Sequence, residues 1–142
     1  MGQQQLLLII LGVIVVGIAV AVGITMFKDN AVSANRDAVT NDLVNLAARA
    51  QQFYRRPTAL GGGQGSFAPI GTDITRLTSM KAGGVAGQNA NGSYTILTAG
   101  GATTPIILQG LGTETGNDGT SAVKVVMNVW ADSAVVQSSL TN

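Results

Sequence analysis

The chain has 142 residues, a net charge of +1, no Cys and no His, and only 11% of its residues are charged, against about 25% in an ordinary soluble domain. The lack of Cys excludes disulfides and thiolate metal sites, and the lack of His removes the commonest general base and transition-metal ligand. A net charge near zero disfavours binding of nucleic acid through a basic face.

The first 27 residues carry no ionisable side chain, and the first charge along the chain is Lys28. The segment 6–24 contains only Leu, Ile, Val, Ala and Gly, and as a helix it would be about 28 Å long, close to the thickness of a bilayer core. At about −0.4 kcal/mol each, its large aliphatic residues favour the membrane by on the order of 6 kcal/mol. These residues are Leu6, Leu7, Leu8, Ile9, Ile10, Leu11, Val13, Ile14, Val15, Val16, Ile18, Val20, Val22 and Ile24.

A cleaved signal peptide is the first alternative for this segment. Such a peptide has a basic start, a shorter apolar run and a small-x-small cleavage site. No Lys or Arg precedes the segment, and its apolar run is too long, so we expect a retained membrane helix. Lys28 and Arg36 follow the helix, which weakly favours an N-terminus outside the cell, but a folded domain is translocated regardless of such a bias. Charge alone therefore leaves the orientation open.

Small residues interrupt the apolar segment at Gly12, Gly17 and Gly23, and Gly17 forms a small-xxx-small pair with Ala21. Such residues let membrane helices approach one another closely. The alternative is that glycine is simply common in membrane helices. Each glycine lowers helix stability by about 1 kcal/mol, so this span is also where the helix would unwind most easily.

The helical pattern continues beyond the apolar segment, since residues 25–56 contain no Gly or Pro. An apolar stripe with helical spacing runs along this part, and Pro57 ends it. We expect one helix of about 80 Å from about Gln4 to Arg56, apolar in residues 1–27 and amphipathic in residues 28–56. The stripe begins at Val32, and the residues expected to pack on the following domain are Val39, Leu43, Leu46, Ala50 and Phe53.

Residues 57–142 resemble a small, glycine-rich α+β domain. We expect a flexible loop at 60–66, a short helix capped by Thr72 or Asp73 and reaching Met80, and a second loop at 81–92. About four strands follow, at 93–98, 104–108, 122–130 and 134–140, with Val123, Val125, Met127 and Val129 on one face of the third. The predicted fold is α+β, with a long N-terminal helix packed on a small antiparallel sheet.

No catalytic, metal or cofactor site is predicted. The glycine-rich stretches lack the lysine of a P-loop, and residues 110–116 lack the dinucleotide-binding spacing. Glu114, Asn117 and Asp118 could offer oxygen ligands to calcium, but their spacing matches no defined motif, and a solvated turn fits better. Asn91-Gly92-Ser93 fits the N-glycosylation sequon, which is short and often arises by chance.

The uncharged N-terminal helix, its amphipathic continuation and the following glycine-rich domain with an antiparallel sheet resemble the type IV pilins. The resemblance implies that the apolar half anchors the subunit in the inner membrane, with the N-terminus inside, before the pilus assembly machinery adds it to a filament. That half then lies in the core of a helical homopolymer on the cell surface, and the globular domain forms the outside. Two alternatives are a pseudopilin of a secretion or uptake machine and a monomeric, membrane-anchored domain that binds a ligand on its glycine-rich loops.

The sequence departs from this family at its start. The family carries a basic leader cut after a glycine and a Glu early in the apolar helix, whereas this sequence has Gln3, Gln4 and Gln5 followed by unbroken Leu and Ile. If the chain keeps Met1 or has a blocked amine, no charge has to be compensated there, and the three amides could form uncharged hydrogen bonds between subunits. The alternative is that the three glutamines are only a polar anchor at the membrane edge.

Overall fold

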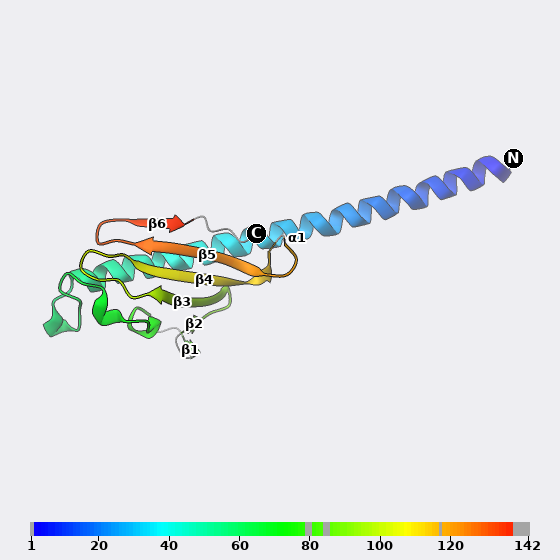
Figure 1. Cartoon of the computed structure of the whole chain (residues 1–142). Coiled ribbons are helices and arrows are strands. Elements are labelled where there is room, and N and C mark those ends of the chain that lie inside the picture. The colour runs from blue at the N-terminus through cyan, green and yellow to red at the C-terminus, as the bar shows by residue number, and fades with distance from the viewer. Residues whose placement is uncertain (1, 79–80, 84–85, 117, 138–142) are drawn as a thin grey trace.

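The computed structural model describes residues 2–78, 81–83, 86–116 and 118–137, and it has one long helix with a sheet against its second half (Figure 1). Helix α1 spans Gly2–Arg55 without interruption, which confirms the predicted single helix. It ends one residue earlier than predicted. The residue that precedes a proline is disfavoured in the helical conformation, and Arg56 precedes Pro57.

The glycine-rich segment after the helix forms a defined cap instead of the flexible loop predicted for 60–66. It begins with the 3₁₀ turn η1, Thr58–Leu60, and then folds back on the end of α1. The amide of Gly63 donates to the carbonyl oxygen of Phe53 at 2.8 Å, and that of Gly65 donates to Tyr54 at 2.7 Å. A Cβ on Gly63 would overlap the carbonyl oxygen of Ser66. The glycines therefore allow the close approach that satisfies the last carbonyls of the helix.

Two further 3₁₀ turns, η2 at Ala68–Ile70 and η3 at Ile74–Arg76, lead toward the sheet. The helix predicted to reach Met80 is reduced to η3, and Met80 lies outside the described residues. Asp73 caps this turn, as predicted, because its carboxylate accepts from the amide of Thr75 at 2.9 Å.

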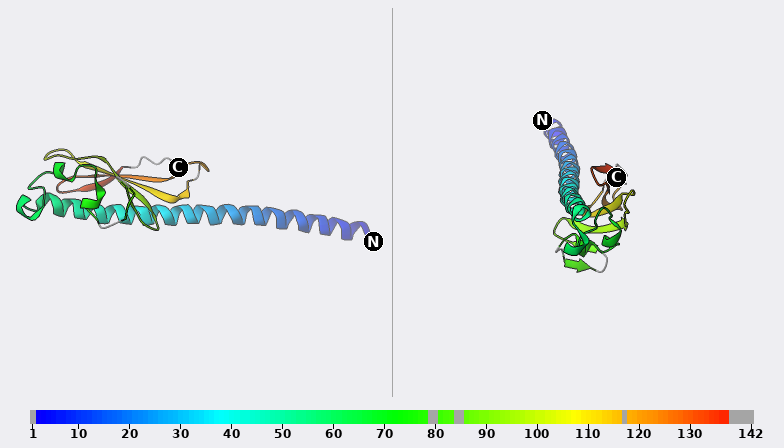
Figure 2. Two further views of the ribbon diagram at one scale, coloured as in Figure 1. Left: turned by 90° about the horizontal axis from the view of Figure 1, so that it is seen from below. Right: turned by 90° about the vertical axis from the view of Figure 1, so that its left-hand side faces the viewer.

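The six strands of the described sheet follow one another in sequence order, and every neighbouring pair is antiparallel. The sheet lies along one side of the second half of α1 (Figure 2), which confirms the predicted α+β fold. The strands are β1 Lys81–Gly83, β2 Ala86–Gln88, β3 Gly92–Thr98, β4 Ile106–Thr115, β5 Ala122–Val129 and β6 Ala134–Gln137.

The prediction of a loop at 81–92, and of about four strands in all, is wrong because β1 and β2 lie in that segment. They pair with each other and with β3, where Gly87 is opposite Tyr94. Ladder hydrogen bonds need only the backbone, so strands of Ala and Gly form without the alternating large residues by which a strand is recognised in a sequence.

The four predicted strands are confirmed as β3, β4, β5 and β6, with different ends. β4 continues to Thr115 through Gly110, seven residues beyond its predicted end. Gly110 lies under the helix, where a Cβ would overlap Val39 and crowd the ring of Tyr94. The predicted inner face of β5 is buried, and β6 is described as far as Gln137, so the predicted end of that strand lies outside the described residues.

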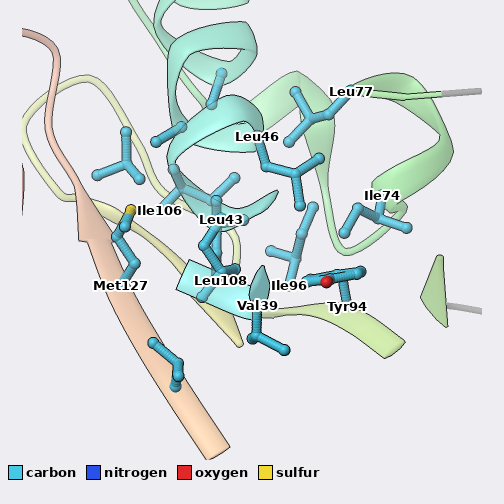
Figure 3. Close-up of a cluster of buried hydrophobic side chains, with 14 of the residues drawn as sticks. Val39, Leu43, Leu46, Ile74, Leu77, Tyr94, Ile96, Ile106, Leu108 and Met127 are labelled. Carbon is cyan, nitrogen blue, oxygen red and sulfur yellow. The ribbon is translucent and has the colours of Figure 1, made fainter. Parts of the chain in front are cut away.

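The hydrophobic core lies between α1 and the sheet (Figure 3). Val39, Leu43 and Leu46 project from the helix toward the inner faces of β3, β4 and β5, while Ile74 and Leu77 close one side. Ala50 and Phe53 continue the same buried stripe toward the end of α1.

Candidate assembly surface

The first half of α1 carries an apolar surface that no described part of the chain covers (Figure 1). All fourteen Leu, Ile and Val side chains of residues 6–24 are between 51% and 67% exposed, and the first buried residue of the helix is Val32. By length and composition this helix could span a membrane. Apolar patches of this size on soluble proteins mark contacts with lipid or with other chains.

Small residues lie on two opposite sides of this apolar half. At about 100° per residue, Gly12 and Gly23 are only about 20° apart around the helix axis, whereas Gly17 and Ala21 lie about 140° and 180° away from Gly12. A Cβ on any of the three glycines would meet nothing within 4 Å. The glycines are therefore not required by packing within the chain, and each side offers a neighbouring helix a place of close approach.

The three glutamines at the start of the helix are exposed. Within the described part of the chain, the side chains of Gln3, Gln4 and Gln5 form no hydrogen bond with another residue. Gln3 and Gln4 line a shallow open hollow together with Leu7 and Leu8. They are thus available to partners outside the chain, whether lipid headgroups, water or another subunit.

A polar cluster that the sequence analysis missed joins the second half of α1 to the sheet. The Oδ2 atom of Asp42 accepts three hydrogen bonds, from Nδ2 of Asn89 at 2.8 Å, Nδ2 of Asn91 at 2.8 Å and the hydroxyl of Tyr94 at 2.6 Å. These donors come from the turn between β2 and β3 and from β3 itself. The cluster fixes this end of the sheet to a defined turn of the helix.

The cluster changes the acidity of two of its members in opposite directions. Burial alone would raise the pKa of Asp42, but the hydrogen bonds from Asn91, Tyr94 and Asn89 together outweigh it and hold that pKa below its ordinary value. Burial and the Asp42 carboxylate raise the pKa of the Tyr94 hydroxyl well above its ordinary value. At neutral pH the pair is therefore an ionised acceptor and a protonated donor.

Replacing Asp42→Asn is expected to lower the free energy of unfolding by about 1 to 2 kcal/mol at pH 7, the lower part of the range for charged hydrogen bonds, because the cluster is only partly buried. Because the pKa of Asp42 is lowered on folding, its stabilisation is complete above the unfolded-state pKa near 3.8 and is lost as the pH falls through the folded-state value. Urea unfolding between pH 7 and pH 2 should show the two proteins converging. Asp37→Asn, at an exposed position of the same helix, is the control and should differ little from wild type at any pH.

A second amide reinforces this attachment. Asn35 donates from Nδ2 to the carbonyl oxygen of Asn91 at 3.0 Å, and its Oδ1 accepts from the amide of Glu114 at 3.4 Å. The side chain of Asn91 is the acceptor of the predicted glycosylation sequon. Its Nδ2 atom, to which a glycan would be attached, already donates to Asp42, so modification would remove a donor from the cluster.

The three candidate calcium ligands do not form one loop. Glu114 belongs to strand β4, and Asn117 lies outside the described residues. Asp118 caps the turn before β5, since its Oδ1 accepts from the amides of Thr120 at 3.0 Å and Ser121 at 2.9 Å. Over residues 2–78, 81–83, 86–116 and 118–137, no group of three His, Cys, Asp or Glu side chains could hold a metal ion.

The sequence located the apolar part of this surface because exposure there follows from composition. It did not reveal the Asp42 cluster, whose donors lie 47 to 52 residues along the chain. Comparisons with protein-family models, curated protein sequences and solved structures find no match. The interpretation of this surface therefore depends on the geometry of the chain itself.

Proposed function

We propose that this chain is the structural subunit of a type IV pilus-like filament, which forms when the apolar half of α1 packs against the same segment of other copies. The observation that carries the proposal is that fourteen large aliphatic side chains are exposed on a helix that projects beyond the sheet. The sheet covers only the second half of α1, so the first half needs lipid or other subunits as its surroundings.

The two sides of the apolar half favour a polymer over a closed dimer. A two-fold dimer uses one patch on each copy, whereas a filament needs two different patches so that each subunit contacts a neighbour on either side. Gly12 and Gly23 mark one side of the helix, and Gly17 and Ala21 mark the other. Each copy therefore has a place of close approach for two different neighbours.

The length of the helix also suits a membrane-anchored precursor. Residues 25–31 lie between the apolar segment and the first buried residue, Val32, and they span about 10 Å. That distance exceeds the headgroup layer on one side of a bilayer, which is about 5 to 7 Å thick. The hydrophobic core of the folded domain thus lies outside the bilayer while residues 6–24 occupy the hydrocarbon layer, and assembly exchanges lipid for neighbouring helices.

A substitution at Gly17 tests the proposal. Gly17→Leu is expected to leave membrane insertion and the folded domain intact, because a Cβ at this position meets nothing within the chain, but to abolish filaments by blocking close helix approach. The measurement is negative-stain electron microscopy of full-length protein, combined with membrane fractionation.

Val16→Leu is the matched control, since it adds volume at the adjacent position without filling a small-residue site, and it should form normal filaments. Normal filaments from Gly17→Leu would contradict the proposed packing. Wild-type protein that remains monomeric, with its apolar half covered by lipid, would instead support a membrane-anchored binding domain.

A further inference from the structure

Three arginines surround a hollow at the end of α1 that is farthest from the apolar half. The hollow has a volume of about 420 Å³. We call it the arginine hollow, and it is lined by Arg49, Gln52, Phe53, Arg56, Arg76 and Leu77. Arg49 and Arg56 lie two turns apart on one side of the helix, and Arg76 is brought to them by turn η3.

The arginine hollow gathers more positive than negative charge: Asp73 interacts electrostatically with Arg76 but lies outside the lining of the hollow. Arg49 donates to the carbonyl oxygen of Leu77 at 3.4 Å, and Arg76 donates to that of Pro69 at 2.6 Å. Among the described residues, no carboxylate forms an ion pair with Arg49, Arg56 or Arg76. Because each guanidinium has five N–H donors, most of the donors around the hollow are open to an anion, which would also relieve the repulsion between the three charges.

The opposite end of the folded domain has the opposite charge. Around the end of the helix with the arginine hollow, the described side chains include four bases and two acids: Arg49, Arg55, Arg56, Arg76, Asp73 and Asp132. Around the end nearer the membrane they include three bases and four acids, namely Lys28, Arg36, Lys124, Asp29, Asp37, Glu114 and Asp118, while Asp42 lies between the two ends, near Arg49. One copy of the chain therefore has two ends of complementary charge.

Glu114 is one of three exposed acids at the second end, with Asp29 and Asp37, and it is the one that lies on the sheet and has the longest side chain. Its backbone amide is fixed to Asn35 of the helix at 3.4 Å, but its side chain is exposed and has no partner among the described residues. Two further acids, Asp42 and Asp118, are less available, because Asp42 accepts three hydrogen bonds and Asp118 caps the turn before β5.

We propose that the arginine hollow of one copy receives Glu114 of a second copy, so that the folded domains of the filament join through ends of opposite charge. This inference rests on the proposed function, because a filament brings the two ends together repeatedly. Asn35 and Gln52 are 17 residues apart on the helix, so parallel copies in this contact are displaced along the helix direction by about 25 Å.

The contact would contribute specificity more than strength. Arginine binds carboxylate through paired, charge-assisted hydrogen bonds, but an exposed pair is screened by salt and is worth little by itself. In a filament the same contact recurs at every subunit, and it fixes how far each domain is displaced from the next. Apolar packing of α1 alone fixes this displacement less firmly, because its large residues are similar along the segment.

Charge reversal in the full-length chain tests the contact. Arg56→Glu is expected to raise the protein concentration needed for filament formation about fivefold at low salt, and less at high salt, where exposed ion pairs are screened. Sedimentation of filaments measures this concentration. Arg55→Glu is the matched control, because Arg55 is the adjacent residue, carries the same charge and does not line the hollow. It should assemble close to wild type.

Reversing the charge of Glu114 distinguishes a direct contact with Arg56 from a general effect of charge on assembly. Glu114→Arg alone should impair assembly as Arg56→Glu does, and the double variant should recover most of it. Inorganic phosphate, added as a competing anion at constant ionic strength, should weaken wild-type filaments but not those of Arg56→Glu.

Equal effects of Arg55→Glu and Arg56→Glu, or a double variant no better than the single ones, would overturn the inference. So would phosphate that strengthens the filaments, since the occupant would then be a free anion. In each case the proposed function would stand if the wild type still polymerises. A wild type without filaments would count against the proposed function itself.

Discussion

A chain that starts at Lys28 is expected to be a soluble monomer that retains the sheet and the second half of α1. Every residue of the described hydrophobic core lies at or after Val32, so the deletion removes no core contact. It does remove the fourteen exposed aliphatic side chains, which favour a membrane by on the order of 6 kcal/mol. Size-exclusion chromatography without detergent and circular dichroism measure the two expectations.

The full-length chain in the same buffer is the control, and it should require detergent or form filaments. Filaments from the shortened chain would show that the sheet and not the apolar helix drives polymerisation. A shortened chain that is unfolded would instead show that the first half of α1 stabilises the domain in a way that the burial pattern does not indicate.

The helical part of the fold was predictable because its signals are local and strong. An uninterrupted helix follows from 19 apolar residues and then a stripe spaced at three, four and seven, and Pro57 determines where it ends. The strands with alternating large residues, β3 and β5, were predictable for the same reason. By contrast, β1, β2 and the second half of β4 consist largely of small or polar residues, and their pairing depends on neighbours that only the folded sheet supplies.

Glycine misled the prediction in two places, for one physical reason. The glycines at 60–66 are predicted to form a flexible loop, and the strand that contains Gly110 is predicted to end at residue 108, but the structure uses these glycines for the space that a missing Cβ leaves. Gly63 lets the chain return to the last turn of α1, and Gly110 lets β4 pass under Val39. A sequence shows that a glycine is present but not which backbone or side chain approaches it.

The candidate sites also contain one part that could be predicted from the sequence and another that could not. The exposed apolar half was predictable from composition, and Arg49 and Arg56, seven residues apart, could have been placed on one helix face. Arg76 joins them only after the chain has reversed through η1 and η2. The Asp42 cluster and the charge difference between the two ends likewise depend on long-range contacts, so sequence alone could not have assembled them.

Leu43→Ala is expected to destabilise the folded domain by about 3 kcal/mol, because the side chain is fully buried between α1 and the sheet (Figure 3) and truncation leaves a cavity. For a domain of this size, that loss corresponds to a fall of about 10 to 20 °C in the midpoint of thermal unfolding. Calorimetry or circular dichroism on the chain that starts at Lys28 measures it.

Val44→Ala is the matched control, because Val44 is the next residue of the same helix and is 51% exposed. It should change stability by less than about 0.5 kcal/mol, since only exposed surface is lost and alanine favours the helix. Equal losses from the two substitutions would mean that the helix does not contact the sheet through the Leu43 side.

If Leu43→Ala lowers stability much more than Val44→Ala does, the second half of α1 is an integral part of the domain. Packing of the apolar half between subunits then also fixes the orientation of each sheet, because both belong to one continuous helix.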